Sequence, residues 1–171
     1  RGLRVHVATA FSVPKPHTPF QWEKQIEPEE YLRRCRLLNS HFYSKSIEYD
    51  YHEPALSRLE AVFARGDRRV GSVIAEALKR GARLDGWDEH FNNEAWMQAF
   101  ERCKLDINFY TTRGYGEDEV LPWDHIDVGV TKKFLLKERH RAMEGLVTPD
   151  CREKCAGCGA NCLLKEVACD A

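Results

Sequence analysis

The sequence predicts an α/β fold at its amino end, then a mainly α-helical extension and a cysteine-rich tail. Two segments, 3–13 and 47–51, show the alternation of apolar and polar residues typical of strands, and the segment between them has helical apolar spacing. Four of the seven cysteines fall within the twelve residues 151–162. We expect a parallel β-α-β unit over 1–53, the helical extension over 54–146 and the tail over 147–171.

The β-α-β unit begins with a strand in which Val5 and Val7 alternate with polar residues. A helix is expected from Pro28 to about residue 46, because proline suits the first helical position and acidic residues follow it in the first turn. Its apolar face is predicted to contain Tyr31, Cys35, Leu38 and Phe42. The alternating segment 47–51 then predicts the second strand, which ends before Pro54.

The helical extension should begin with a capping box at Ser57–Glu60. The predicted helix buries Leu59, Val62 and Phe63 and ends at Gly66. Asp67 is expected to cap the next helix, which ends at Gly81. The predicted buried face of that helix consists of Val70, Val73, Ile74, Ala77 and Leu78.

Aromatic residues mark the rest of the extension. Trp87, Phe91 and Trp96 are expected in its core, on a loop and a helix that also contains Phe100 and Cys103. Residues 111–121 are polar and contain glycine, which predicts a mobile linker. Thr131 should cap a last helix over 132–144, ended by Gly145.

Composition limits the possible functions. The chain has 171 residues, 43% of them hydrophobic, with a formal net charge of −1, which predicts a folded core and no global attraction to nucleic acid. It contains no apolar run of membrane-spanning length and no signal peptide, so we expect a cytoplasmic protein without a membrane partner.

Two parallel strands cannot bury both faces of a sheet, and the chain starts almost inside a strand. We therefore expect its main partner to be a missing N-terminal part of the same polypeptide.

The most informative segment follows the first strand and reads AFSVPKPHTPFQW over residues 10–22. Three prolines force the chain out of the sheet into a stiff loop, because proline lacks the backbone N–H that a sheet requires. Loops at the carboxyl ends of parallel strands commonly bind ligands in α/β proteins.

This loop resembles the one after the sixth barrel strand in radical S-adenosylmethionine (SAM) proteins that carry a cobalamin-binding domain. The resemblance extends to ARGDRRVG at 64–71, GARLDGW at 81–87 and LPWDHI at 121–126, and covers nearly all of residues 1–162. These phrases are similar to the carboxyl-terminal region of one family of such proteins, whose reaction is not settled.

The resemblance implies a partial radical SAM barrel and an enzyme that uses SAM, a 4Fe–4S cluster and cobalamin on a small-molecule or RNA substrate. The catalytic cluster motif would lie upstream, so this part alone should be inactive. The strand end and loop would face SAM or substrate through Phe11, Ser12, Val13, Lys15, His17 and Thr18. A rigid structural loop is the alternative interpretation.

The four clustered cysteines, Cys151, Cys155, Cys158 and Cys162, predict a metal site with the spacing C-x3-C-x2-C-x3-C. A 4Fe–4S cluster and zinc both suit four thiolates, and the close spacing is nearer to that of ferredoxins. Unmetallated thiols near the terminus are the third alternative. The first three cysteines have the spacing of the radical SAM motif. They follow a helix rather than the first barrel strand, and a fourth cysteine can close the site, so we interpret it as auxiliary or structural.

Two further clusters allow a structural and a functional interpretation. Arg65, Arg68 and Arg69 could bind phosphate or RNA, although a solvated helix end with local ion pairs is the simpler explanation. Asp124 and His125 could serve as an acid–base pair, whereas a loop anchored by Trp123 and capped by Asp124 is the structural alternative.

The rival function is a non-enzymatic module in which a zinc-bound tail and the helices contact RNA or a protein partner. The identity of the metal that the tail binds would distinguish the enzyme from the non-enzymatic module. An independent hydrolase or transferase is disfavoured, because the sequence has no phosphate-binding loop, no nucleophile elbow and no paired histidines at zincin spacing.

Overall fold

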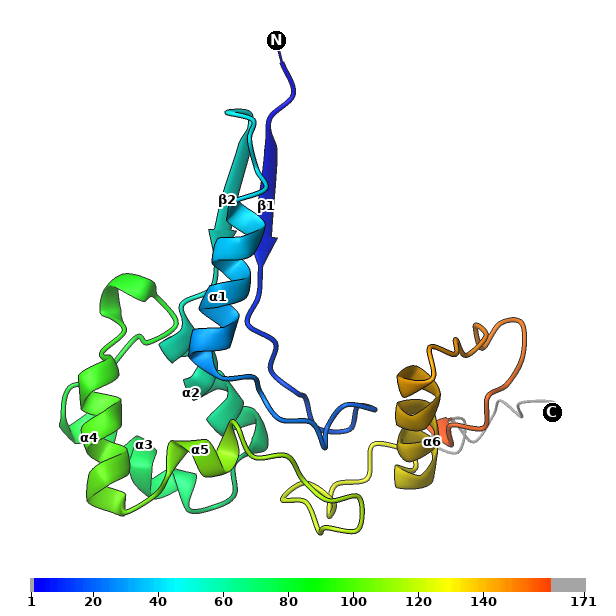
Figure 1. Ribbon diagram of the computed structural model, residues 1–171. Helices are drawn as coiled ribbons and strands as arrows, with labels where there is room; N and C mark the ends of the chain where they lie inside the picture. The colour runs from blue at the N-terminus through cyan, green and yellow to red at the C-terminus, as the bar shows by residue number, and fades with distance from the viewer. Residues whose placement is uncertain (1, 161–171) are drawn as a thin grey trace. The chain divides into compact units, whose positions relative to one another are not determined.

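A computed structural model describes residues 2–160 of the chain, which fold as two compact units (Figure 1). Of these residues, the first unit contains 2–13 and Lys24–Arg113, and the second contains Pro14–Glu23 and 114–160. The proline-rich loop therefore belongs mostly to the second unit, although the strand before it belongs to the first. The domain boundaries predicted near residues 53 and 146 stay a prediction.

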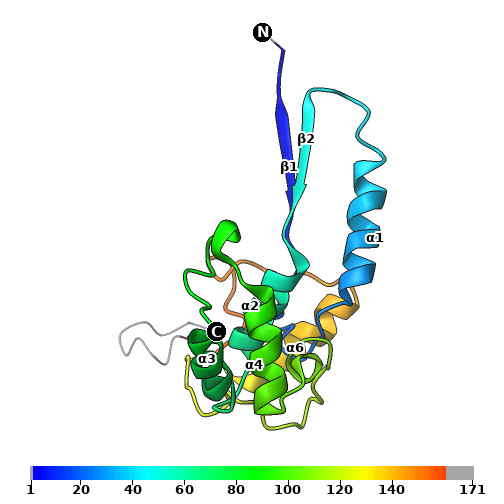
Figure 2. The same ribbon diagram turned by 90° about the vertical axis from the view of Figure 1, so that its left-hand side faces the viewer.

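The first unit begins with the predicted parallel β-α-β unit. Strand β1 (Val5–Thr9) pairs in parallel with β2 (Ile47–Tyr51), and helix α1 (Pro28–Asn39) connects them alongside the sheet (Figure 2). The register runs from Val5 opposite Ile47 to Thr9 opposite Tyr51. The α/β class and the mostly helical continuation are confirmed, and β1 is shorter than the predicted strand.

One face of the strand pair packs against α1. Phe11, Tyr31 and Cys35 are buried together, and the Tyr31 hydroxyl donates a 3.1 Å hydrogen bond to the Thr9 carbonyl oxygen. The Thr9 and Tyr49 hydroxyls are 2.8 Å apart on the same face. Because side chains alternate along a strand, His6, Glu48 and Asp50 lie on the opposite face, where all three are exposed.

Helix α1 ends at Asn39, seven residues before the predicted end, so the predicted length is wrong. The Ser40 hydroxyl donates to the Leu37 carbonyl oxygen at 2.7 Å, and His41 Nδ1 lies 2.8 Å from that oxygen. Such local side-chain hydrogen bonds compete with helix continuation. Phe42 consequently lies beyond the helix, with its ring 5.3 Å from that of Tyr49.

The remaining helices of the first unit share one core. They are α2 (Pro54–Arg65), α3 (Val70–Lys79), α4 (Asn93–Cys103) and the short α5 (Ile107–Tyr110), with a 3-10 turn η1 at Asp88–His90. Helix α4 packs against α3, and α5 packs against α2. The core includes Val62, Val73, Trp96, Phe100 and Tyr110.

Two details of α2 differ from expectation. It begins at Pro54 rather than at a Ser57–Glu60 capping box, because proline starts the helix and the Glu53 carboxylate accepts the Ala55 N–H. Ser57 is instead buried inside the helix. Gly66 ends α2 as predicted. The predicted Asp67 cap of α3 is wrong, because Arg69 occupies the N-cap position and the Asp67 carboxylate instead accepts the Arg69 N–H in the preceding turn.

Several apolar side chains that were predicted to be buried are exposed. Phe63, Ile74, Leu78 and Trp87 remain 47%, 46%, 53% and 62% exposed. Three of them flank a buried stripe on α2 or α3. Helical spacing indicates which residues share a face, but only the neighbouring elements decide how wide a stripe is covered.

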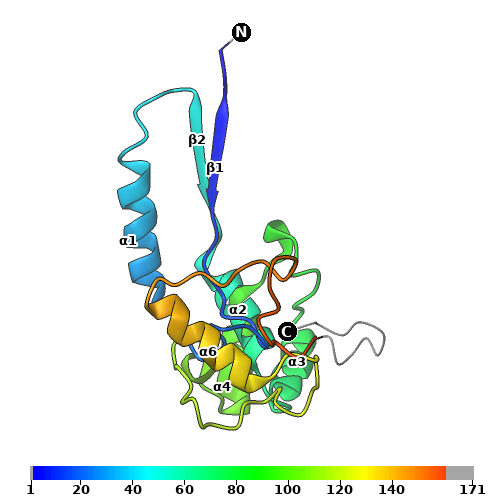
Figure 3. The same ribbon diagram turned by 90° about the vertical axis from the view of Figure 1, so that its right-hand side faces the viewer.

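The second unit surrounds a core of Trp22, Tyr115, Leu121, Trp123 and Leu135. Helix α6 (Lys132–Met143; Figure 3) supplies Leu135. Its Arg139 donates a 2.7 Å hydrogen bond to the Glu23 carboxylate. Thr131 caps α6 through the Phe134 N–H, and Gly145 follows the helix with a φ of 71°, both as predicted. The predicted mobile linker at 111–121 is wrong, because Thr111, Tyr115 and Leu121 are buried.

Across residues 2–160, no helix combines the length and the apolar character needed to cross a membrane.

Candidate functional site

The first half of the predicted ligand loop lies in the first unit. Phe11 is 3% exposed, and its ring stacks on Tyr31 at a centroid distance of 4.3 Å and an interplanar angle of 6°. Ser12 is exposed and Val13 is half-buried. Phe11 is therefore a core residue. Of Phe11, Ser12 and Val13, Ser12 has the exposed polar side chain that a ligand can contact.

The second half of the loop lies in the second unit, where His17 occupies an unusual backbone conformation. Its φ is 55°, in the left-handed region that residues other than glycine seldom adopt. The His17 N–H donates a 2.9 Å hydrogen bond to Gln21 Oε1, and the Trp123 indole N–H donates to the same oxygen at 2.7 Å. Gln21 is 2% exposed. One buried amide thus holds both the strained loop and the Trp123 segment.

Lys15 and Thr18 form the turn around His17. The Thr18 hydroxyl donates to the Lys15 carbonyl oxygen at 2.8 Å, and the Gln21 N–H donates to the Thr18 carbonyl oxygen at 3.1 Å. The Thr18 hydroxyl therefore supports the loop, whereas the Lys15 side chain is exposed.

His17 and Asp124 line one pocket of about 270 Å³ in the second unit. Other polar residues of its wall are Gln21, Asp127, Thr131 and Lys132. Residues of the proline-rich loop and of the LPWDHI segment both line this pocket. The hydrogen bond between Gln21 and Trp123, which are 102 positions apart, links the two motifs. Its volume is just below the usual range for ligand pockets, about 300–1,000 Å³, which suits a small ligand or one end of a larger one.

Asp124 is the charged centre of this pocket. Its carboxylate accepts the Leu121 N–H at 3.0 Å and the Lys132 ammonium at 3.0 Å. Burial raises the pKa of Asp124, but the Leu121 and Lys132 donors, with a smaller contribution from His17, outweigh burial and lower the pKa below its ordinary value. Asp124 is therefore held as a carboxylate, and it caps the Trp123 loop as expected.

The His17 imidazole completes the polar set. Among the residues that the structure describes, none forms a hydrogen bond to the buried Nε2 atom of His17. An unsatisfied ring nitrogen beside a carboxylate and an ammonium group can bind a polar ligand or exchange a proton with it. His125 also lines the pocket, but its side chain is exposed.

The cysteine segment belongs to the second unit and contacts a residue of the pocket wall at Cys158. The Thr131 N–H donates to the Cys158 carbonyl oxygen at 3.0 Å, so this segment lies beside a residue of the pocket wall. Gly159 has a φ of 97°, and a Cβ there would lie 2.8 Å from the Gly129 carbonyl oxygen, so only glycine fits.

The described cysteines do not form a ready metal site. Cys151 is exposed, and Cys155 and Cys158 are half-buried. Within residues 2–160, no group of three or more His, Cys, Asp or Glu side chains is arranged to hold a metal ion. The fourth predicted ligand, Cys162, lies outside the described residues.

The prediction of a solvated arginine cluster is wrong for Arg65. Arg65 is fully buried and donates to the carbonyl oxygens of Thr111 and Arg113 at 2.9 and 3.0 Å. Arg68 and Arg69 are exposed, and Arg69 forms the expected ion pair with Asp67 at 2.6 Å. Arg65 is thus a structural residue.

Sequence reasoning missed Gln21 and Lys132 as site residues. Gln21 is part of the proline-rich loop motif, but no local pattern indicates that a glutamine is buried or from which distant donors it accepts hydrogen bonds.

Comparisons with models of protein families, with curated proteins and with solved structures find no match to this chain.

Proposed function

We propose that this chain is the carboxyl-terminal part of a radical SAM, cobalamin-dependent enzyme, in which β1 and β2 are the last strands of a larger parallel barrel. The observation that supports this most is the chemical contrast between the two faces of the strand pair. One face packs on α1, whereas the other exposes His6, Glu48 and Asp50, with His6 Nε2 2.8 Å from Asp50 Oδ2.

The polar face favours a barrel over an open sheet. Parallel sheets that are covered by helices on both faces have apolar strands throughout. A strand pair with helix on one face and charged side chains on the other suits a wall between a helical layer and a polar lumen. Further parallel strands, from the rest of the same polypeptide, would extend the β1–β2 pair.

The position of the loop supports a role on the ligand side of that barrel. Phe11, Ser12 and Val13 follow the carboxyl end of β1, where parallel barrels place their active sites. Lys15, His17 and Thr18 continue into the pocket segment of the second unit. In this proposal Ser12 lies on the SAM side, and the His17–Asp124 pocket receives part of a small-molecule or RNA substrate.

SAM supplies the radical chemistry when it is bound, and its catalytic cluster and cobalamin would be held by the upstream part of the polypeptide. The tail would hold a separate 4Fe–4S cluster. Because the described thiols are not gathered, metal binding would have to draw the segment together, as coupled metal binding and folding does in small metal-binding segments.

The direct test of the enzyme class is the coding sequence upstream of Arg1. A strand followed by C-x3-C-x2-C, with a cobalamin-type domain before it, is the expected result. If the same reading frame holds no such motif, the enzyme proposal is wrong.

The metal is tested on this chain after anaerobic purification. A brown protein with iron and sulfide is expected, with Cys155→Ser losing the colour and Cys103→Ser retaining it. Cys103 is a suitable control because it packs against the helical core. Stoichiometric zinc in a colourless protein would instead favour the non-enzymatic module.

A further inference from the structure

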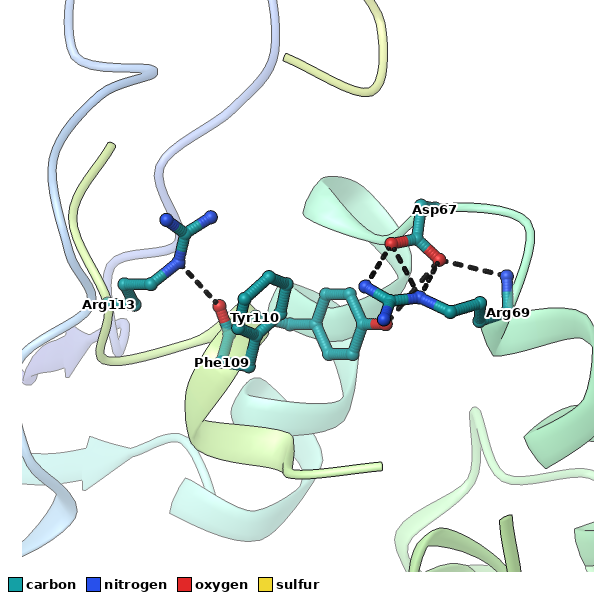
Figure 4. Close-up of polar contacts among 5 residues, drawn as sticks. All are labelled: Asp67, Arg69, Phe109, Tyr110 and Arg113. Carbon is teal, nitrogen blue, oxygen red and sulfur yellow. Dashed lines mark hydrogen bonds and ion pairs between the residues drawn. The ribbon is translucent and has the colours of Figure 1, made fainter. Parts of the chain in front are cut away.

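A cluster of aromatic and arginine side chains, which we call the Phe109 surface, lies on the first unit and shares no residue with the pocket. It consists of Phe109 with Arg58, Arg69 and Arg113, and the exposed Arg68 is next to Arg69 in the sequence. The Phe109 ring is 40% exposed, and the guanidinium carbons of Arg113 and Arg69 lie 4.3 and 5.4 Å from its centre. Figure 4 shows the Phe109 and Tyr110 rings between these two arginines.

The two guanidinium groups are held in place by other contacts. Arg69 forms several hydrogen bonds to the Asp67 carboxylate, the shortest at 2.6 Å, and Asp67 also accepts the Tyr110 hydroxyl at 3.5 Å (Figure 4). Arg113 Nε donates to the Phe109 carbonyl oxygen at 3.4 Å. Arginines whose planes are already ordered lose little conformational entropy when a ligand stacks on them.

The surface is also positively charged. Arg58 donates to Asn108 at 2.7 Å, which places a third guanidinium beside the residue preceding Phe109. Arg68 is exposed and adjacent in sequence to Arg69. Asp67 pairs with Arg69, and the Asp106 carboxylate accepts the Asn108 N–H beside Arg58. The four arginines therefore outnumber these two carboxylates, although the chain has a net charge of −1.

From this combination we infer that the Phe109 surface binds single-stranded nucleic acid. Bases stack on aromatic rings and on guanidinium planes, while neighbouring arginines neutralise the phosphates. An acidic peptide would match the charge but would not use the planar groups. The inference goes beyond the proposed enzyme function and does not depend on it.

The test is fluorescence anisotropy of the whole chain with labelled 12-nucleotide oligouridine and, in a second arm, oligothymidine of the same length. We expect binding that weakens with salt, and about tenfold weaker binding for Arg113→Ala. Arg113→Lys keeps the charge but loses the plane, and should recover only part of the affinity. Arg68→Ala should reduce the slope of log affinity against log salt by about 0.7, since one phosphate contact is lost.

Arg83→Ala is the matched control, because Arg83 is an exposed arginine in the loop after α3. Circular dichroism of every variant establishes that the helices are retained, and Arg68→Ala decides the outcome if Arg113→Ala unfolds. Preference for oligouridine assigns RNA, and preference for oligothymidine assigns DNA. The inference is overturned if neither oligonucleotide binds, if Arg68→Ala matches Arg83→Ala, or if only an acidic peptide competes for the surface.

Discussion

Gln21 and Trp123 are joined by a 2.7 Å hydrogen bond from the indole Nε1–H to the Gln21 side-chain oxygen, across 102 positions of the chain. The same oxygen accepts the His17 N–H. A single buried acceptor therefore sets the conformation of the proline-rich loop and anchors the segment that contains Asp124.

Replacing Gln21 tests this relationship. Gln21→Leu should lower the free energy of unfolding by about 2–4 kcal/mol, because the buried Trp123 N–H and the partly buried His17 N–H lose their acceptor. Gln21→Glu, which keeps an acceptor oxygen, should be less destabilising. Urea unfolding followed by tryptophan fluorescence measures both. Equal stability of the two variants would mean that the shared acceptor is unimportant.

Gly66 should not tolerate a larger side chain, although its φ of −73° is ordinary. A Cβ there would lie 2.5 Å from the Val62 carbonyl oxygen and 2.7 Å from a Val70 methyl carbon. Gly66→Ala should destabilise the first unit by about 1–3 kcal/mol through overpacking. Gly71→Ala, at a site with nothing within 4 Å of the added Cβ, is the control. Thermal unfolding by circular dichroism should separate them, and similar midpoints would contradict the steric argument.

Arg65 should be essential for stability, unlike its neighbour Arg68. Arg65→Lys leaves one ammonium for two carbonyl oxygens and should lower the free energy of unfolding by about 2 kcal/mol. Arg68→Ala should change it by less than about 0.5 kcal/mol, as is usual for exposed sites. Denaturant unfolding measures the difference. A neutral Arg65→Lys would show that the planar fork is not required.

Asp124 should make part of the stability pH-dependent. Its folded-state pKa is lower than its unfolded value, which is about 4. Its contribution is therefore complete above that value and is lost as the pH falls from about 4 through the folded pKa. Asp124→Asn should lower the melting temperature at pH 7 and make the decrease below pH 4 shallower.

The acid dependence in this variant should be reduced rather than abolished, because Arg69 also lowers the pKa of Asp67, against the effect of burial. Circular dichroism melts at pH 7, 4 and 3 measure the effect, with the exposed Asp118→Asn as the control. Identical pH profiles for Asp124→Asn and the unsubstituted chain would rule out the proposed contribution.

Local patterns predicted the elements well wherever the decisive interactions lie within a few residues. The strand pair, Thr131 as a helix cap, Gly145 as a helix end and buried Cys35 were all found this way. Errors arose where neighbouring groups competed locally, as at Ser40 and His41, or where burial depended on distant partners, as at Phe63 and Trp87.

The candidate pocket was predicted only in pieces. Sequence reasoning selected His17 and Asp124 separately, from a proline-rich loop and from a tryptophan motif. It could not join them, because no periodicity relates residues about a hundred positions apart. The cation–aromatic cluster at Phe109 was missed for the same reason, since Arg69 and Arg113 belong to different segments.

Hydrophobic alternation, proline and capping side chains were enough to establish the parallel strand pair and its helical continuation, because these signals act over one or two turns of chain. Folding in three dimensions decided that Gln21 is buried between two donors, that Arg65 is an interior residue and that Phe109 lies between two guanidinium groups. Burial and hydrogen-bond partnership are properties of packed neighbours, and those neighbours come from remote parts of the chain.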